Sequence, residues 1–250
     1  MIWSERPGGN QGIGYYTNWE KCADNGCIYC GKQANTREHV PSKAFLIKPY
    51  PTDLPTVPAC YECNNGFSED EVYTSCCIDI LKETVCVDYS RTRKTVELFE
   101  RRKSLKDMIE GQIKIKGEKV ILSVEWERIY RILIKLARGH AGFAMDYVLL
   151  NADPEIKLLK FKSEMSDNEL SRFEEMPCMD IIPEIGCRFS ASPVIVQNSN
   201  SGEAILIVEW VEVQENQYRY QVYFGDNSGE LIVKIVIYEF LYCMIVFETN

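Results

Sequence analysis

Four cysteines in two close pairs are the residues of this chain whose types and spacing most plainly point to chemistry. Two residues separate Cys27 from Cys30 and Cys60 from Cys63, and 29 residues lie between the two pairs. Each pair fits a turn that aims two thiolates at one ion, and four thiolates complete the tetrahedral shell of Zn²⁺ with no position left for water. The spacing therefore predicts a structural zinc site that fastens two loops.

Other uses of these cysteines fit less well. Cys22 could replace one ligand, but it lies five residues before Cys27, and a redox Cys-x-x-Cys motif would need one pair rather than two. The cysteine count of 11 is odd, and residues 1–10 lack the basic start and apolar run of a secretory signal. We therefore expect a reducing, cytoplasmic environment, in which the pairs bind metal and most other cysteines are small buried apolar residues.

Between the pairs, Glu38 places a carboxylate directly before the imidazole of His39, and Pro41 should end any strand because it has no amide donor. An isolated histidine is more often a hydrogen-bonded structural residue. Here, however, the predicted zinc turns hold both ends of the loop, and Asn64 follows the last cysteine directly. A neutral imidazole, with a usual pKa of about 6.5, is suited to take a proton from water at pH 7. We therefore favour a catalytic role for His39.

Three segments resemble the HNH endonucleases of the ββα-metal fold, in the branch that zinc stabilises. They are Cys-Ile-Tyr-Cys-Gly at 27–31, Glu-His-Val-Pro-Ser-Lys at 38–43 and Val-Pro-Ala-Cys-Tyr-Glu-Cys-Asn at 57–64. Residues 63–71 are also similar to a bacterial subgroup of that family, and the resemblance covers about residues 22–85. It implies a metal-dependent nuclease that hydrolyses the phosphodiester bonds of DNA, and the habits of the family include phage defence.

The resemblance also implies roles for individual residues. His39 matches the general base, while Glu38 and Asn64 match the ligands of a catalytic Mg²⁺ or Mn²⁺ ion, with Asn65 as an alternative ligand. Such an ion polarises the phosphate and stabilises the leaving 3′-oxygen. Glu38 stands where the family usually has Asp, and Pro55 stands where it usually has its middle Asn.

The charge distribution limits where nucleic acid could bind. The net charge is −9, and it lies entirely in residues 121–250, with 11 Lys and Arg against 20 Asp and Glu, whereas residues 1–120 carry 17 of each sign. An acidic protein binds nucleic acid poorly except through a local basic surface. Candidate phosphate contacts are Arg37, Lys43 and Lys48, with plain surface charge as the alternative. Residues 90–107 are the one basic stretch, either a solvated helix face or a further phosphate contact.

Apolar periodicity predicts an α+β protein. We expect a ββα-metal hairpin and helix with structural zinc, followed by a mixed, β-rich part. The predicted domains are an N-terminal arm at 1–20, the nuclease domain at 21–110 and a C-terminal α/β domain at 111–250. Ser68 and Glu71 should form a capping box for a helix at 68–84, and Gly139 should end a helix at 126–138 before a structural His140. Predicted strands are 156–161, 188–196, 204–213, 218–224 and 231–238, with 240–247 a strand or helix end.

Three functions remain open from the sequence. The leading one is a DNA endonuclease, in which the acidic C-terminal half contacts a protein partner or a second copy of the chain. The second is a non-catalytic zinc module that binds nucleic acid or protein, and the third is a nuclease that acts on RNA. No run of eighteen apolar residues is present, which excludes a membrane-spanning segment as the sequence is read.

Overall fold

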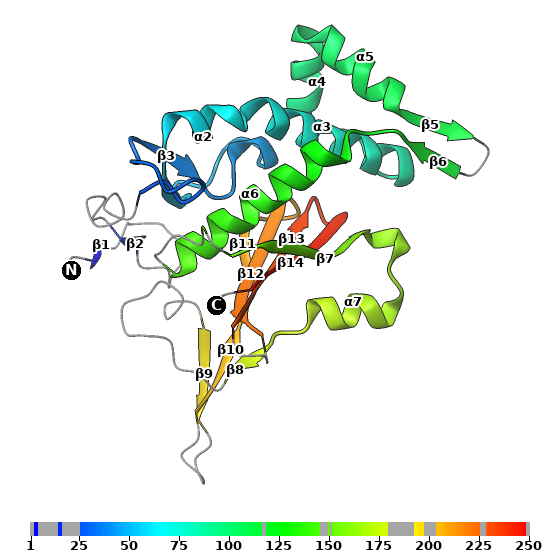
Figure 1. Cartoon of the computed structure of the whole chain (residues 1–250). Helices are drawn as coiled ribbons and strands as arrows, with labels where there is room; N and C mark the ends of the chain where they lie inside the picture. Colours follow the sequence, from blue (N-terminus) through cyan, green and yellow to red (C-terminus); the bar gives the residue numbers. More distant parts are fainter. Residues whose placement is uncertain are drawn as a thin grey trace.

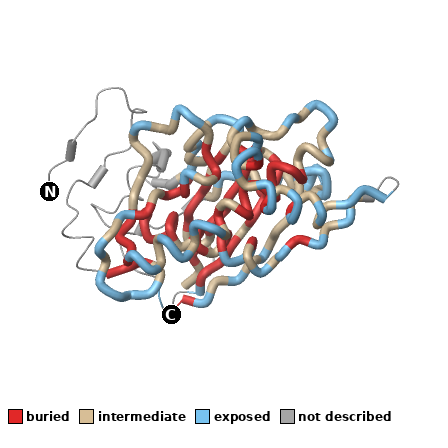
Figure 2. Tube along the Cα trace, turned by 90° about the horizontal axis from the view of Figure 1, so that it is seen from above, coloured by how far each residue is buried: buried red, intermediate tan, exposed pale blue. Residues whose placement is uncertain are grey.

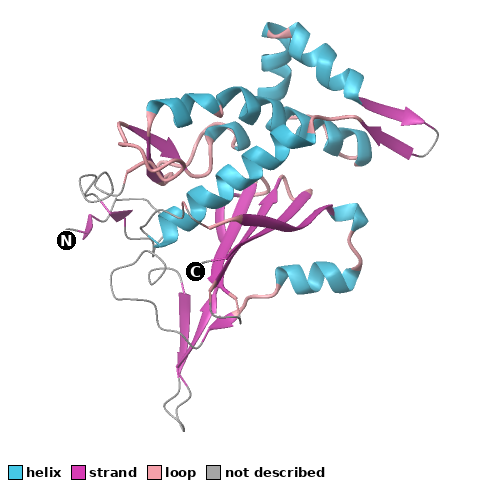
Figure 3. Ribbon diagram, in the orientation of Figure 1, coloured by secondary structure: helices cyan, strands magenta, loops and turns pink. Residues whose placement is uncertain are grey.

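The fold is mixed α+β, as the sequence predicts, with helices in the first half and strands dominating the second (Figures 1 and 3). A computed structural model of the chain describes residues 3–4, 15–16, 26–116, 119–145, 150, 152–179, 193–197, 204–225 and 229–248. Most of the predicted N-terminal arm, Cys22 and the first half of the predicted strand 188–196 lie outside these residues. In the arm, the structure describes a two-stranded pair, β1 (Trp3–Ser4) and β2 (Tyr15–Tyr16).

The segment that carries the cysteine pairs forms a short antiparallel hairpin followed by helices. Its elements are β3 (Thr36–His39), the 3-10 helix η1 (Lys43–Phe45), β4 (Thr56–Ala59), α2 (Tyr61–Gly66) and α3 (Ser68–Val85). In the hairpin, His39 pairs with Thr56, and β3 ends there, two residues before Pro41, as expected. The long helix expected at 68–84 is confirmed as α3.

A second group of helices and a small hairpin leads to the central helix. These elements are α4 (Arg93–Arg101), α5 (Lys103–Gln112), β5 (Ile113–Lys116), β6 (Lys119–Leu122) and α6 (Trp126–Met145). The prediction that Gly139 ends the last helix is wrong, because α6 continues through it. The lack of a side chain has another use there: a Cβ on Gly139 would lie 3.1 Å from the Val40 side chain, so the glycine lets α6 approach the loop after His39.

The predicted capping box at the start of α3 is also wrong. Phe67 is the N-cap residue and makes no side-chain cap, while the Ser68 hydroxyl donates to the Asn65 carbonyl oxygen at 2.8 Å. Glu71, which was to complete the box, is instead buried against α6. A tertiary ion pair has therefore taken a side chain that local sequence assigned to a helix end.

The second half of the chain is built on a five-stranded antiparallel sheet in the order β11-β12-β13-β14-β7. The strands are β7 (Pro154–Phe161), β11 (Val211–Gln214), β12 (Tyr218–Phe224), β13 (Glu230–Ile237) and β14 (Leu241–Glu248). A separate three-stranded sheet contains β8 (Cys178–Met179), β10 (Ala204–Val208) and β9 (Pro193–Gln197). The predicted strand at 204–213 is therefore two strands in different sheets, and 241–248 is a strand.

Helices cover both faces of the five-stranded sheet. On one face α6 lies between the sheet and α3 (Figure 1). Ile132 and Leu133 of α6 share a core with Val233 and Ile235 of β13, and the buried residues gather along the middle of the molecule (Figure 2). The opposite face packs against α7 (Asp167–Glu174), which follows the short 3-10 helix η2 (Lys162–Glu164), in a smaller cluster around Phe173. The main core thus includes side chains from both sides of the predicted boundary at residues 110–111.

His140 lies inside this main core and has a structural environment, as expected. It is fully buried, its Nε2 shares a 2.8 Å hydrogen bond with the Tyr218 hydroxyl, and its ring stacks on Tyr220 at 3.7 Å between centroids. Burial, together with the charge of Lys135, lowers the pKa of His140 well below its usual value. Across the described ranges, none of the helices combines the length and apolarity needed to cross a lipid bilayer.

The first prediction concerns the central helix. Ile132→Ala should lower the free energy of unfolding by about 2–5 kcal/mol, because it opens a cavity in the core that joins α6 to the sheet. Ile115→Ala is the matched control, since Ile115 is 67% exposed and Ile132 is 0% exposed, and it should change stability by less than about 0.5 kcal/mol. Urea denaturation measures both. Equal effects of the two substitutions would contradict the placement of α6.

Candidate functional site

The first cysteine pair lies in a tight turn that backbone hydrogen bonds close. The amide of Cys27 donates to the Lys32 carbonyl at 2.7 Å, and the amide of Gly31 donates to the Cys27 carbonyl at 2.8 Å. Gly26 and Gly31 have φ angles of 78° and 73°, a left-handed conformation that glycine adopts without steric cost. The turn is joined to the second pair because the amide of Ile28 donates to the Pro58 carbonyl at 3.2 Å.

The second cysteine pair opens a helix. Cys60 is the N-cap of α2, and its Sγ accepts a hydrogen bond from the Cys63 amide at 3.4 Å. The Asn64 amide donates to the Cys60 carbonyl at 3.0 Å. On the other side, the amide of Tyr61 donates to the Asn35 side chain at 2.8 Å, which ties the start of α2 to the residue before β3.

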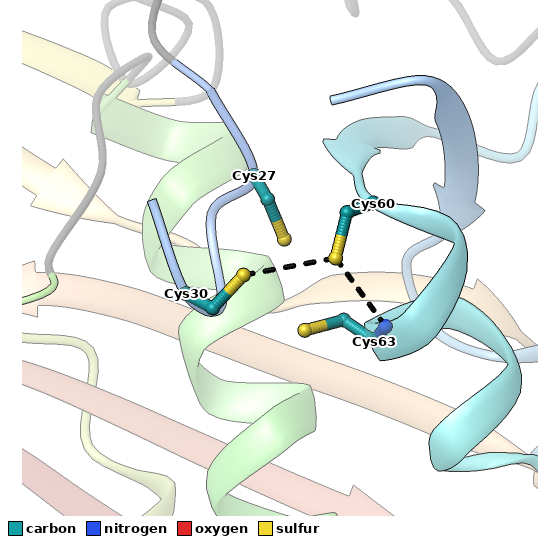
Figure 4. A group of neighbouring side chains, drawn as sticks. All are labelled: Cys27, Cys30, Cys60 and Cys63. Atoms are coloured by element: carbon teal, nitrogen blue, oxygen red, sulfur yellow. Dashed lines mark hydrogen bonds between the residues drawn. The ribbon is translucent and has the colours of Figure 1, made fainter. Parts of the chain in front are cut away.

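The two turns bring the four predicted ligands together. The Sγ atoms of Cys27, Cys30, Cys60 and Cys63 all lie within 4.8 Å of one another, and those of Cys30 and Cys60 are 3.6 Å apart (Figure 4). In a tetrahedral shell with Zn–S bonds of about 2.3 Å the sulfurs are about 3.8 Å apart, so the set fits zinc. Burial, with the neighbouring sulfurs, raises the pKa of Cys63, which leaves the thiolate in need of a cation. The cluster could therefore hold a structural metal ion.

His39 lies at the end of β3 in a partly enclosed position. The residue is half-buried, and its Nδ1 atom is buried with no hydrogen-bond partner among the described residues. Burial lowers the pKa of His39, and the positive charges of Lys43 and Lys135 lower it further. The lowered pKa favours the neutral imidazole at pH 7, which is the form that can accept a proton.

Glu38 points away from His39, as neighbours on a strand do, and it lies in the protein interior. It is 6% exposed, and it accepts a 2.8 Å hydrogen bond from Lys135 Nζ of α6. The same ammonium group forms an ion pair with Glu71 of α3. Burial raises the pKa of Glu38, and the charge of Lys135 opposes this rise. One buried lysine thus joins β3, α3 and α6.

Neither the burial of Lys135 nor its pairing with Glu71 was predicted from the sequence. The one available signal was a cation inside the apolar run Ile-Leu-Ile-Lys-Leu-Ala at 132–137, where a helix of this pattern buries most of its side chains. This pattern indicates that Lys135 is buried and therefore needs an anionic partner. It does not say which carboxylate supplies it, because the partners lie 97 and 64 residues away in the chain.

Asn64 ties α2 to the hairpin. Its Nδ2 donates to Thr36 Oγ1 at 3.1 Å and to the Arg37 carbonyl at 3.3 Å, which leaves the amide oxygen as its possible metal ligand. The neighbouring Asn65 is exposed. Pro55, at the position of the family's middle Asn, accepts a 2.9 Å hydrogen bond from the Val40 amide and so closes the hairpin beside His39.

The expected ligands of a catalytic Mg²⁺ ion are thus not arranged as a ready site. Carboxylate and amide oxygens suit this ion, but Glu38 is paired with Lys135, and a divalent ion would have to replace that contact. Within the parts of the chain that the structure describes, the four cysteines form the one group of three or more His, Cys, Asp or Glu side chains placed to hold a metal.

The three predicted phosphate contacts are all exposed. Arg37 shares a strand face with His39, since the two residues alternate with Glu38 on β3. Lys43 begins η1, with its Nζ 5.6 Å from the centre of the Tyr50 ring, and Lys48 lies further along the same loop. Arg37 and Lys43 thus add positive charge on the His39 side of the hairpin.

The basic stretch at 90–107 forms α4, α5 and their flanks. Part of its charge is used in ion pairs, such as those of Arg91 with Glu83 and Glu110 and that of Arg102 with Glu69.

Comparison of the chain with protein-family models, with curated proteins and with solved structures finds no match to any of the three.

The second prediction concerns the cysteine cluster. Purified protein should contain about one zinc ion per chain, and Cys30→Ser should lose the metal and lower the melting temperature, because three thiolates leave the shell incomplete. Cys86→Ser is the matched control, since Cys86 lies outside the cluster, and it should keep its zinc. Elemental analysis and thermal melting measure both properties. Zinc-free wild-type protein, or full occupancy in Cys30→Ser, would contradict the site.

The third prediction concerns Lys135. Lys135→Met should destabilise the protein by about 3–5 kcal/mol at pH 8, because it leaves two buried carboxylates without a counter-charge. The folded-state pKa of Glu38 is already above 4.5, so the folded state binds more protons than the unfolded state above that pH, and stability from this group falls as pH rises. The variant should raise this pKa further and should therefore lose less stability at pH 5 than at pH 8.

Glu38→Gln in the Lys135→Met background should restore part of the lost stability, because it removes one of the unpaired charges. Urea denaturation at the two pH values measures the effect in each variant. A Lys135→Met variant whose loss of stability is the same at pH 5 and pH 8 would show that the lysine is not the counter-charge of these carboxylates.

Proposed function

We propose that this protein is a nuclease that hydrolyses DNA phosphodiester bonds with His39 as the general base. The observation that carries the proposal is a neutral, half-buried imidazole at the end of a hairpin whose base meets the four-cysteine cluster. The succession of β3, β4 and α2 supports the expected ββα arrangement, in which a rigid hairpin presents the histidine to the substrate.

The side chains around His39 suggest how such a reaction proceeds. His39 takes the proton from the attacking water through Nε2, because Nδ1 is buried and has no hydrogen-bond partner among the described residues. Arg37 and Lys43 bind the phosphate oxygens and offset their charge. A divalent ion, when bound, would polarise the phosphate, with Asn64 and Glu38 as its ligands once Glu38 separates from Lys135.

A second candidate is a zinc module that binds DNA or a protein without cutting. The pairing of Glu38 with Lys135 favours it, since a committed ion pair removes the carboxylate from metal binding. Pro55 at the position of the family's middle Asn favours it as well. This candidate expects binding that depends on zinc and is indifferent to His39.

The fourth prediction tests the nuclease. Wild-type protein should convert supercoiled plasmid to open or linear forms in Mg²⁺ or Mn²⁺, and His39→Ala should lower the rate at least about a hundredfold, the usual contribution of a general base. Gln33→Ala, at an exposed position before the hairpin, is the control and should keep full activity. Because the pKa of His39 is lowered, the base stays unprotonated to a more acidic pH, so the rate should hold down to about pH 6.5 and fall below it.

Several outcomes separate the candidates. Full cleavage by His39→Ala with unchanged zinc content would reject His39 as the base. Absence of cleavage by the wild type in either metal, with retained plasmid binding, would favour the zinc module. Digestion of duplex RNA but not of DNA would move the proposal to the RNA-directed alternative, and an EDTA control shows whether the cleavage needs the divalent ion.

A further inference from the structure

A hollow of about 700 Å³ lies where the loop after His39 meets α3, α4 and the turn between β13 and β14. Its lining comes from residues 44–50, from α3, from α4 with its N-cap and from Tyr238. A hollow of this volume is in the range that takes a small organic ligand. Its wall is continuous with η1, which begins four residues after His39.

The wall on the loop side is fixed by a lysine that is itself part of the lining. Lys94 Nζ donates to the carbonyl oxygens of Lys43, Ala44 and Leu46 at 2.5, 2.8 and 3.1 Å. These contacts hold residues 43–46 against α4. The hollow is therefore a formed feature of the fold rather than a gap between loosely placed segments.

The rim of the hollow is cationic. Lys48, Arg93 and Arg101 line it together with Lys94, and Glu97 is its one carboxylate. Glu97 pairs with Arg93 at 2.8 Å and reaches Arg101 at 3.9 Å, yet these arginine side chains remain 92% and 76% exposed. In a chain of net charge −9, such a concentration of positive charge attracts an anion.

The inner surface is apolar and only half covered. Five of its aliphatic and aromatic residues have intermediate exposure, namely Ala44, Ile47, Tyr50, Val72 and Leu98. A flat ring would cover this surface and remove it from water, which is favourable in proportion to the apolar area buried.

Tyr238, in the turn between β13 and β14, also lines the hollow, and its backbone has an unusual conformation. Its φ is 58°, and that of Glu239 is 50°, values that residues with bulky side chains rarely adopt. Lys82 Nζ donates to the Tyr238 carbonyl at 2.5 Å, and Arg219 pairs with Glu239 at 2.5 Å. Contacts from α3 and β12 thus hold the turn that carries Tyr238.

We propose that this hollow binds a nucleotide, with the phosphate at the rim near Lys48 and Arg101 and the base against the apolar wall. The combination of a cationic rim and an apolar interior suits a ligand that carries an anion at one end and a flat ring at the other. Two sources share this chemistry, a free nucleotide and a nucleotide within a nucleic-acid strand. The site stands independently of the nuclease proposal, since binding needs neither His39 nor a divalent ion.

The fifth prediction tests this site by calorimetric titration of the full chain without added divalent cations. The probes are deoxyadenosine 5′-monophosphate, deoxyadenosine, inorganic phosphate and a single-stranded oligodeoxynucleotide. The monophosphate should bind saturably and more tightly than deoxyadenosine or phosphate alone. The Lys48→Glu/Arg101→Glu variant should lose at least about tenfold in affinity, because both charges are reversed at the rim.

Lys114→Glu/Lys116→Glu is the matched control, since it makes the same change of charge at exposed positions of β5 outside the hollow. Thermal melting shows that both variants are folded. Saturable binding of the mononucleotide identifies a free nucleotide as a ligand, whereas binding of the oligonucleotide alone, weakened by the rim variant, identifies a strand. Equal binding by the two variants, equal affinity for inorganic phosphate and the monophosphate, or no binding of any probe would overturn the proposal.

Discussion

The contact on which this structure depends most is the buried ammonium group of Lys135 between Glu38 and Glu71. A charge in a protein interior is tolerated where opposite charges meet it with good geometry, so the three elements that supply these side chains must keep their relative positions. Those elements are the strand that carries His39, the helix that follows the cysteine cluster and the central helix α6. Because α6 also packs on the five-stranded sheet, one lysine relates the candidate site to the rest of the fold.

The four-cysteine cluster lies in the same region, where little apolar surface is buried. In the two cysteine turns and the hairpin, the buried apolar side chains form small groups, such as Ile28, Val40 and Val57 with Phe143 of α6, whereas Phe45 and Leu46 of the intervening loop join the main core. Little hydrophobic stabilisation is available in these turns and the hairpin, and a metal ion bound by both turns would stabilise them in another way. With metal bound, the hairpin would be held at its base by thiolates and along its inner face by the lysine, so that His39 could be presented with little freedom.

Exposed and buried cations have different roles in this structure. Exposed cations lie on the His39 side of the hairpin and around the rim of the neighbouring hollow, while the acidic excess lies in residues 121–250. Buried cations on the sheet serve the structure: Lys234 donates to the carbonyls of Phe173 and Glu175, and Arg219 joins Glu174 to Glu239. Local surface charge, rather than the net charge of the chain, therefore decides which molecules this protein could bind.

Features that depend on neighbours in the chain could be predicted from the sequence. The spacing of the cysteines defined a four-thiolate cluster, and apolar periodicity located α3, α6 and most strands of the sheet, because these signals are set within a few residues. Tertiary structure alone decided that Glu71 pairs with Lys135 instead of capping α3, that α6 runs through Gly139, and that residues 204–214 divide between two sheets. It also decided that Glu38 faces the interior. Each of these outcomes rests on contacts between distant segments, whose geometry and desolvation outweigh local preference.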